Sequence, residues 1–295
     1  MAVMSTQRSL RGQNFDSLGY HVERGVLGAA DIAEIRDAFT SMHASGGAKG
    51  LYEPAPQGVD DGFHHNFAKG DPLAIYPRVM HPHKFMPAAK KYLLDQRIFA
   101  VLEDLLGEEA LTAQSMFYFK PPSARGQAWH QDNFYLNVHP GTCLAAWMAI
   151  DAADDENGGL QIIPRTNVIP VICPEKNADP TQSFTKEIVP MAELLKTMGA
   201  TYGKDLVAAP EGVEAHKLQM KAGDVLFFNG SVVHGSGPNH SKDRFRRSFI
   251  CHYVGRSCVE LSEHYHPLMD KAGNPVGREV AAEGGPCGTE HDAPH

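Results

Sequence analysis

The stretch Gln127-Ala128-Trp129-His130-Gln131-Asp132 places an imidazole and a carboxylate two residues apart. On an extended strand, residues i and i+2 project from the same face. We therefore expect His130 and Asp132 to lie on one face of a strand end, where both can bind one metal ion. One further histidine would complete a 2-His-1-carboxylate triad, which leaves adjacent coordination positions open. His234 is the candidate, because it follows the apolar run 224–228, which is predicted to be a buried strand.

Two other pairs of histidines compete with this assignment. His81-Pro82-His83 contains a proline that does not suit a central strand, so we place it at the entrance of the helical pattern that follows. His264-Tyr265-His266 comes after the last predicted core strand, so we place it in a tail. A His-x-Asp pair also occurs by chance at the ends of surface strands. The distal histidine and the basic cluster 244–247 favour residues 130–132 as the metal site.

One arginine of this basic cluster is a candidate for binding an organic acid. The triad is typical of non-haem Fe(II) oxygenases, in which the open positions accept a bidentate 2-oxo acid and O₂. The far carboxylate of 2-oxoglutarate needs a guanidinium that can donate two parallel hydrogen bonds. Arg246 fits best, because it lies 12 residues past His234 and shares strand parity with Ser248. We expect Arg247 to face the opposite way and Arg244 to lie near the preceding loop.

Composition and charge narrow the class of protein further. The chain has 295 residues and a net charge of −8, and its basic residues are scattered, which argues against a nucleic-acid-binding surface. Residues 1–15 lack the apolar core of a signal peptide, and no run reaches the length of a membrane span. The five cysteines are odd in number and lack C-x-x-C spacing, which indicates reduced thiols. We expect a cytoplasmic enzyme that acts on a small molecule, and the sequence leaves its oligomeric state open.

The order of the predicted elements indicates a mainly β fold with N-terminal helices. A strand is expected at 17–22, a helix at 31–43 and a second helical pattern that Gly107 ends. Strands follow at 113–119, 143–152 and 160–164, and the turn at 154–159 predicts that the last two form a hairpin. Many short strands with ligands at their ends suit a double-stranded β-helix, the jelly roll of cupins.

We expect residues 1–295 to form a single domain with four parts. Residues 16–110 would form a helical N-terminal support, and residues 111–255 the jelly-roll core. An insertion at 165–222 could act as a lid over the mouth of the core or be a passive surface excursion. Residues 256–295 would form a tail that covers the surface.

Several motifs together resemble the phytanoyl-CoA dioxygenase family of Fe(II)- and 2-oxoglutarate-dependent oxygenases. They are Phe119-Lys120-Pro121-Pro122, Trp129-His130-Gln131-Asp132, Glu156-Asn157-Gly158-Gly159-Leu160, Gly223-Asp224 and His234-Gly235-Ser236-Gly237-Pro238-Asn239. The likeness runs in order from about Gly19 to Val254. The sequence departs from the family at Pro164-Arg165-Thr166-Asn167, where a Pro-Gly-Ser-His turn is common.

The resemblance implies a fold, a set of cofactors and a site. It implies the jelly roll, Fe(II) bound by the triad, 2-oxoglutarate as co-substrate and O₂. It also places the co-substrate arginine in Phe245-Arg246-Arg247, with Ser236 and Trp147 near the co-substrate. Lys120 is a further candidate as a cation, and Gln127 is a candidate at the start of the metal-binding stretch.

The reaction that the resemblance implies is the oxidation of an unactivated C–H bond, coupled to conversion of 2-oxoglutarate to succinate and CO₂. Its substrate is expected to be a small metabolite, because no clustered basic surface for the phosphates of coenzyme A stands out. An acyl-CoA 2-hydroxylase and a non-oxygenase, cupin-like binding protein are the alternatives. Halogenation is disfavoured, because Asp132 occupies the position that a halide would need.

Overall fold

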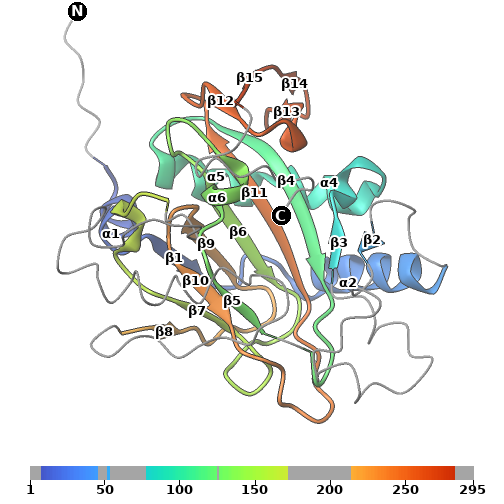
Figure 1. Cartoon of the computed structure of the whole chain (residues 1–295). Coiled ribbons are helices and arrows are strands. Elements are labelled where there is room, and N and C mark those ends of the chain that lie inside the picture. The colour runs from blue at the N-terminus through green and yellow to red at the C-terminus, as the bar shows by residue number, and fades with distance from the viewer. Residues whose placement is uncertain (1–7, 46–51, 54–77, 125, 172–213, 283–295) are drawn as a thin grey trace, which may run out of the picture.

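The computed structural model describes residues 8–45, 52–53, 78–124, 126–171 and 214–282. Over these residues, two antiparallel β-sheets lie against each other, and helices cover the outer face of the larger sheet (Figure 1). The sheets remain open and do not close into a barrel.

The larger sheet has nine strands among the described residues. Its order is β1 (Tyr20–Glu23), β9 (Val225–Asn229), β6 (Leu144–Ala149), β11 (Ser248–Gly255), β4 (Ala110–Tyr118), β13 (Leu268–Met269) and β14 (Pro275–Val276), while β3 (Arg78–Met80) pairs with β4 and with β2 (Tyr52–Glu53). The smaller sheet has the order β5 (Gln127–His130), β10 (His234–Ser236), β7 (Leu160–Ile162) and β8 (His216–Lys217). A parallel pair, β12 (Glu260–Leu261) and β15 (Glu279–Val280), lies apart from both.

The helices of the described residues lie mainly before β4. They are α1 (Leu10–Leu18), α2 (Ala29–Ala44), α4 (Pro87–Leu93), α5 (Gln96–Leu106) and the short α6 (Asn133–Leu136), with 3-10 turns at Pro82–Lys84, Thr166–Val168 and Glu263–Tyr265. The expected helix at 31–43 is confirmed by α2, and Gly107 ends α5 with a left-handed φ of 74°. Gly107 is suited to that conformation because it has no Cβ.

The alternation of side chains along β11 shows how the two halves of the core arise. Phe249 and Tyr253 point toward the helices and pack with Phe39 of α2 and Phe99 of α5. Ile250 points the other way, into a second cluster that includes residues of the smaller sheet. Every residue of β11 is buried, as expected for a strand covered on both faces.

Two of our sequence predictions are wrong in detail. Residues 10–18 form a helix, and the strand expected at 17–22 begins only at Tyr20. The strands β6 and β7 do not form a hairpin, because β6 pairs with β9 and β11 while β7 pairs with β10 and β8. The turn at 154–159 therefore carries the chain from one sheet to the other.

The chain after β11 adds to the edge of the larger sheet. Residue Met269 of β13 pairs with Thr112 of β4, so this part of the tail is joined to the core. Of the insertion expected at 165–222, residues 172–213 lie outside the described residues, and so does the loop 54–77. Within the described residues, no helix has the length and apolar character to cross a membrane.

Candidate metal centre and co-substrate pocket

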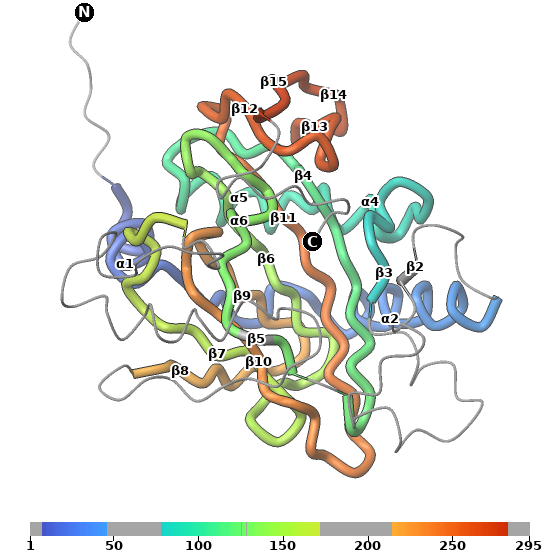
Figure 2. The backbone as a smooth tube through the Cα atoms, viewed as in Figure 1, coloured from blue at the N-terminus to red at the C-terminus, as the bar shows by residue number. Residues whose placement is uncertain are grey.

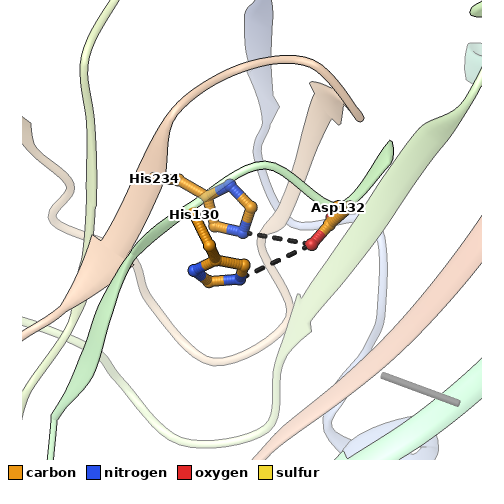
Figure 3. Close-up of side chains that lie close together, drawn as sticks. All are labelled: His130, Asp132 and His234. Atoms are coloured by element: carbon orange, nitrogen blue, oxygen red, sulfur yellow. Dashed lines mark ion pairs between the residues drawn. The ribbon is translucent and has the colours of Figure 1, made fainter. Parts of the chain in front are cut away.

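Three buried side chains converge between the two sheets: His130, Asp132 and His234 (Figure 3). Oδ1 of Asp132 lies 3.6 Å from Nε2 of His130 and 3.5 Å from Nε2 of His234. One ligand atom from each residue lies within 4.8 Å of the others. The three atoms therefore surround one small volume that suits a single ion.

The pairing of β5 with β10 brings the two histidines together. His130 is the register partner of His234, although the two strands are far apart in the sequence (Figure 2). Their ring centroids lie 4.2 Å apart. Nδ1 of His234 lies 3.0 Å from the carbonyl oxygen of Val232, so it is placed to donate a hydrogen bond that leaves Nε2 free to bind a metal.

Asp132 reaches the site by a route that differs from our expectation. The strand β5 ends at His130, and Asp132 has the helical dihedral angles φ −62° and ψ −34° at the start of α6. The two side chains therefore do not share one strand face. They converge because the chain turns from strand to helix between them.

A fourth residue, His252 of β11, contacts the carboxylate of Asp132. Its Nε2 lies 2.9 Å from Oδ2 of Asp132, and both residues are buried. Burial alone would raise the pKa of Asp132, but His234, His252 and His130 outweigh it and hold the pKa of this carboxyl well below its usual range. His252 was not among the residues predicted for the site, although it shares strand parity with Ser248, as Arg246 does.

The donor set fits ferrous iron. Two imidazole nitrogens and one carboxylate oxygen on one side of an ion are the ligands of the facial triad. The other histidine pairs, His81 with His83 and His264 with His266, do not join a three-residue cluster of ligands within the described part of the chain.

A pocket extends from the triad between the sheets. Its empty volume is about 380 Å³, which includes space that is open to solvent. Trp147, Gln127 and Arg246 line it together with the three candidate ligands. The amide nitrogen of Gln127 lies 3.1 Å from Nε2 of His130, so this side chain lies next to the place of the ion.

Arg246 is a buried cation at the wall of this pocket. It is only 4% exposed, and burial lowers its pKa to about 10. Its guanidinium donates to the carbonyl oxygen of Gly158 and to the hydroxyl of Ser248, and its Cζ lies 5.4 Å from the ring centroid of Trp147. Among the described residues, no carboxylate forms an ion pair with it.

The other two arginines of the cluster are paired with carboxylates away from the pocket. Arg247 donates to both oxygens of Asp151, and Arg244 donates to Asp154 and Glu156. Both arginines are partly exposed. The structure thus separates Arg246, which is buried at the pocket, from the two arginines that pair with carboxylates.

Lys120 and Ser236 contact each other but are not among the residues that line the pocket. The ammonium of Lys120 donates to the hydroxyl of Ser236 and to the carbonyl oxygen of Gly158, both at 3.0 Å, and also to the carbonyl oxygen of Gly237. The lysine is 4% exposed. It therefore shares the acceptor Gly158 with Arg246.

The two packed antiparallel sheets and the buried cluster of two histidines and one aspartate define a class of proteins with a cupin-like core and a candidate metal centre. Within that class, the chain belongs to the phytanoyl-CoA dioxygenase family, whose family model matches residues 15–248.

Curated relatives are identical to the chain at about a quarter of the aligned positions. The chain is 24% identical over 192 residues to a probable alpha-ketoglutarate-dependent hypophosphite dioxygenase of Stutzerimonas stutzeri. The aligned residues cover 65% of this chain and 62% of that protein. It is 27% identical over 182 residues to phytanoyl-CoA dioxygenase 1 of Oryza sativa subsp. japonica, with 61% and 58% covered. The chain thus spans about three fifths of the length of these relatives.

Solved structures share the fold at lower identity. The non-heme alpha ketoglutarate dependent carbocyclase SnoK from nogalamycin biosynthesis has a TM-score of 0.63 at 17% identity, with 93% of this chain and 95% of that chain covered. The structure of EctD from S. alaskensis with bound Fe has a TM-score of 0.62 at 18% identity, with 95% and 89% covered.

Proposed function

We propose that the protein is an Fe(II)- and 2-oxoglutarate-dependent dioxygenase that oxidises an unactivated C–H bond of a small metabolite. One observation carries the proposal: Arg246 faces the same pocket as the triad, and no described carboxylate forms an ion pair with it. A buried charge without a counter-ion is costly, so an anion is expected beside it when the site is filled. The distal carboxylate of 2-oxoglutarate supplies that anion.

In this proposal the residues of the site have distinct roles. His130, Asp132 and His234 hold Fe(II), which supplies O₂ activation and the positions to which the 2-oxo acid binds. Arg246 binds the far carboxylate with charge-assisted hydrogen bonds. Trp147 forms an apolar wall that excludes water from this ion pair and strengthens it. One substrate C–H, one 2-oxoglutarate and one O₂ give the hydroxylated product, succinate and CO₂.

Lys120, Ser236 and Gln127 complete the proposed co-substrate site. Lys120 holds the loop at Gly158 and the hydroxyl of Ser236 in place, so Lys120 and Ser236 together support the wall that contains Arg246. Gln127 lies next to the metal-binding nitrogen of His130, where its amide can donate to an atom bound at an open position.

The substrate class is argued from the relatives and from the charge of the chain. The relatives are named for hypophosphite and for phytanoyl-CoA, and one neighbouring structure of EctD contains 5-hydroxyectoine. The basic residues are scattered along the sequence, whereas the phosphates of coenzyme A favour a clustered basic surface. We favour a small metabolite, with an acyl-CoA as the alternative. We also infer that residues 1–295 act as one domain and that the protein is cytoplasmic, which suits the free cysteines Cys143, Cys251 and Cys258.

Succinate production tests the proposal. The purified protein is incubated with Fe(II), 2-oxoglutarate and O₂, alone and with panels of small metabolites and acyl-CoA thioesters. We expect succinate to form slowly without substrate and faster with one class of compound. Protein that binds a ligand without iron and forms no succinate under any condition would be a cupin-like binding protein instead.

A further inference from the structure

We propose that His252 is a positioning residue that makes Asp132 bind iron through one oxygen only. The inference rests on the proposed function, because it requires the triad to bind Fe(II). It assigns a role to a histidine that lines the pocket but is not one of the three candidate ligands.

The two oxygens of Asp132 face different neighbours. Oδ1 lies 3.6 and 3.5 Å from the metal-binding nitrogens of His130 and His234. Oδ2 lies 2.9 Å from Nε2 of His252, which is hydrogen-bonding distance. A carboxylate has no proton to donate, so Nε2 of His252 must carry the hydrogen.

The position of His252 in the fold makes this contact rigid. It lies in the centre of the larger sheet on β11, between its register partners Ala145 of β6 and Gln114 of β4. It is 1% exposed, and its Nδ1 has no hydrogen bond with a described residue. The bond to Asp132 therefore orients the imidazole, and the strand fixes where that bond points.

The consequence concerns the number of open positions on the ion. An octahedral ion with three protein ligands keeps three positions, two for a bidentate 2-oxo acid and one for O₂. Carboxylates also bind metals through both oxygens. If Oδ2 of Asp132 did so, only two positions would remain, and the 2-oxo acid would fill both. The hydrogen bond from His252 occupies Oδ2 and so preserves the third position.

The test uses three substitutions at one residue and a matched control. His252→Leu removes the donor at similar volume, and His252→Gln restores it, because the glutamine amide reaches the place of Nε2. The amide of His252→Asn is too short to reach it. His83→Leu is the control, since His83 is a partly buried histidine whose Nδ1 lies 2.7 Å from Ser115 Oγ rather than near Asp132.

Two readouts report on the metal and not on turnover. The first is the affinity of the purified full chain for Fe(II), titrated without oxygen. Loss of an outer hydrogen bond typically weakens metal binding about 10- to 100-fold, so we expect that loss for His252→Leu and His252→Asn but not for His252→Gln. The second is the binding of nitric oxide to the Fe(II)-2-oxoglutarate complex, measured by electron paramagnetic resonance. We expect a smaller signal in the same two variants.

The outcomes separate this inference from the proposed function. Wild-type Fe(II) affinity and a full nitric oxide signal in His252→Leu would show that His252 only fills space. If the leucine variant does not fold, equal Fe(II) affinities and equal nitric oxide signals in His252→Gln and His252→Asn would show the same. Equal losses in His83→Leu would also contradict the inference. A wild-type protein that binds no Fe(II) would refute the proposed function itself.

Discussion

The carbonyl oxygen of Gly158 accepts a hydrogen bond from Nε of Arg246 at 3.1 Å. The same oxygen accepts from the ammonium of Lys120 at 3.0 Å, so one backbone group orients two buried cations. Gly158 has a φ of +76°, and a Cβ at this position would lie 2.5 Å from the carbonyl oxygen of Gly237. Only glycine satisfies both the backbone conformation and the close approach.

Substitution at this glycine should therefore damage the pocket. We expect Gly158→Ala to lower the free energy of unfolding by about 1 to 3 kcal/mol, because the added Cβ would lie 2.7 Å from the ammonium nitrogen of Lys120. We also expect weaker 2-oxoglutarate binding, because a shift of the Gly158 carbonyl would disturb the hydrogen bond that orients Arg246. Gly237→Ala is the control, since a Cβ there meets nothing within 4 Å. Urea denaturation and a 2-oxoglutarate titration compare Gly158→Ala with Gly237→Ala. Similar effects of the two substitutions would mean that position 158 does not require glycine.

Arg246→Lys should weaken 2-oxoglutarate binding about tenfold or more. Lysine keeps the charge but loses the planar fork that donates two parallel hydrogen bonds, and a hydrogen bond to a charged group contributes roughly 1.5 to 3 kcal/mol. Arg247→Lys should bind 2-oxoglutarate as the wild type does, because Arg247 pairs with Asp151 away from the pocket. An anaerobic titration of the Fe(II) protein measures both affinities. The reverse ranking would assign the co-substrate to Arg247.

Removal of any one triad ligand should abolish turnover. We expect His130→Ala, Asp132→Ala and His234→Ala each to weaken Fe(II) binding more than about 100-fold, since loss of an outer partner alone costs roughly 10- to 100-fold. His81→Ala and His83→Ala should keep wild-type affinity. Metal titration with each variant decides the point, and a wild-type affinity in His130→Ala would place the ion elsewhere.

The sequence pattern predicts which residues gather at the site better than it predicts the backbone geometry that brings them together. The proximity of His130 to Asp132 follows from their spacing, but the expected shared strand face does not exist, because the chain enters α6 at Asp132. A two-residue separation is compatible with both geometries. Local pattern alone does not decide between them, since the strand ends where its pairing with β10 ends.

The failed hairpin has a related cause. The turn at 154–159 is visible in the sequence, and so are the apolar runs on either side of it. Which sheet a strand joins is decided by partners far along the chain, such as Ser236, which pairs with Leu160. His252 was missed for the same reason, because its contact with Asp132 links residues 120 positions apart.

The last prediction concerns stability in acid and starts from His81. This residue has a φ of 47°, and it is buried without a hydrogen bond from its ring to a described residue. Burial, with added repulsion from Lys84 and His83, lowers its pKa from 6.5 to about 3. The unfolded chain therefore binds a proton below pH 6.5 that the folded protein does not bind until about pH 3.

The sign of the effect follows from this difference. The folded state favours neutral His81 over the protonated form, so the contribution of His81 to the free energy of unfolding is fully present above pH 6.5 and is lost as the pH falls toward 3. One pKa unit corresponds to 1.36 kcal/mol, so the free energy of unfolding should fall by about 3 kcal/mol from this residue between pH 7 and pH 4. His81→Asn should reduce that loss, because asparagine does not titrate and tolerates a left-handed backbone. Urea denaturation from pH 7 to pH 4 compares the two proteins, and parallel curves would mean that His81 is not the group that titrates.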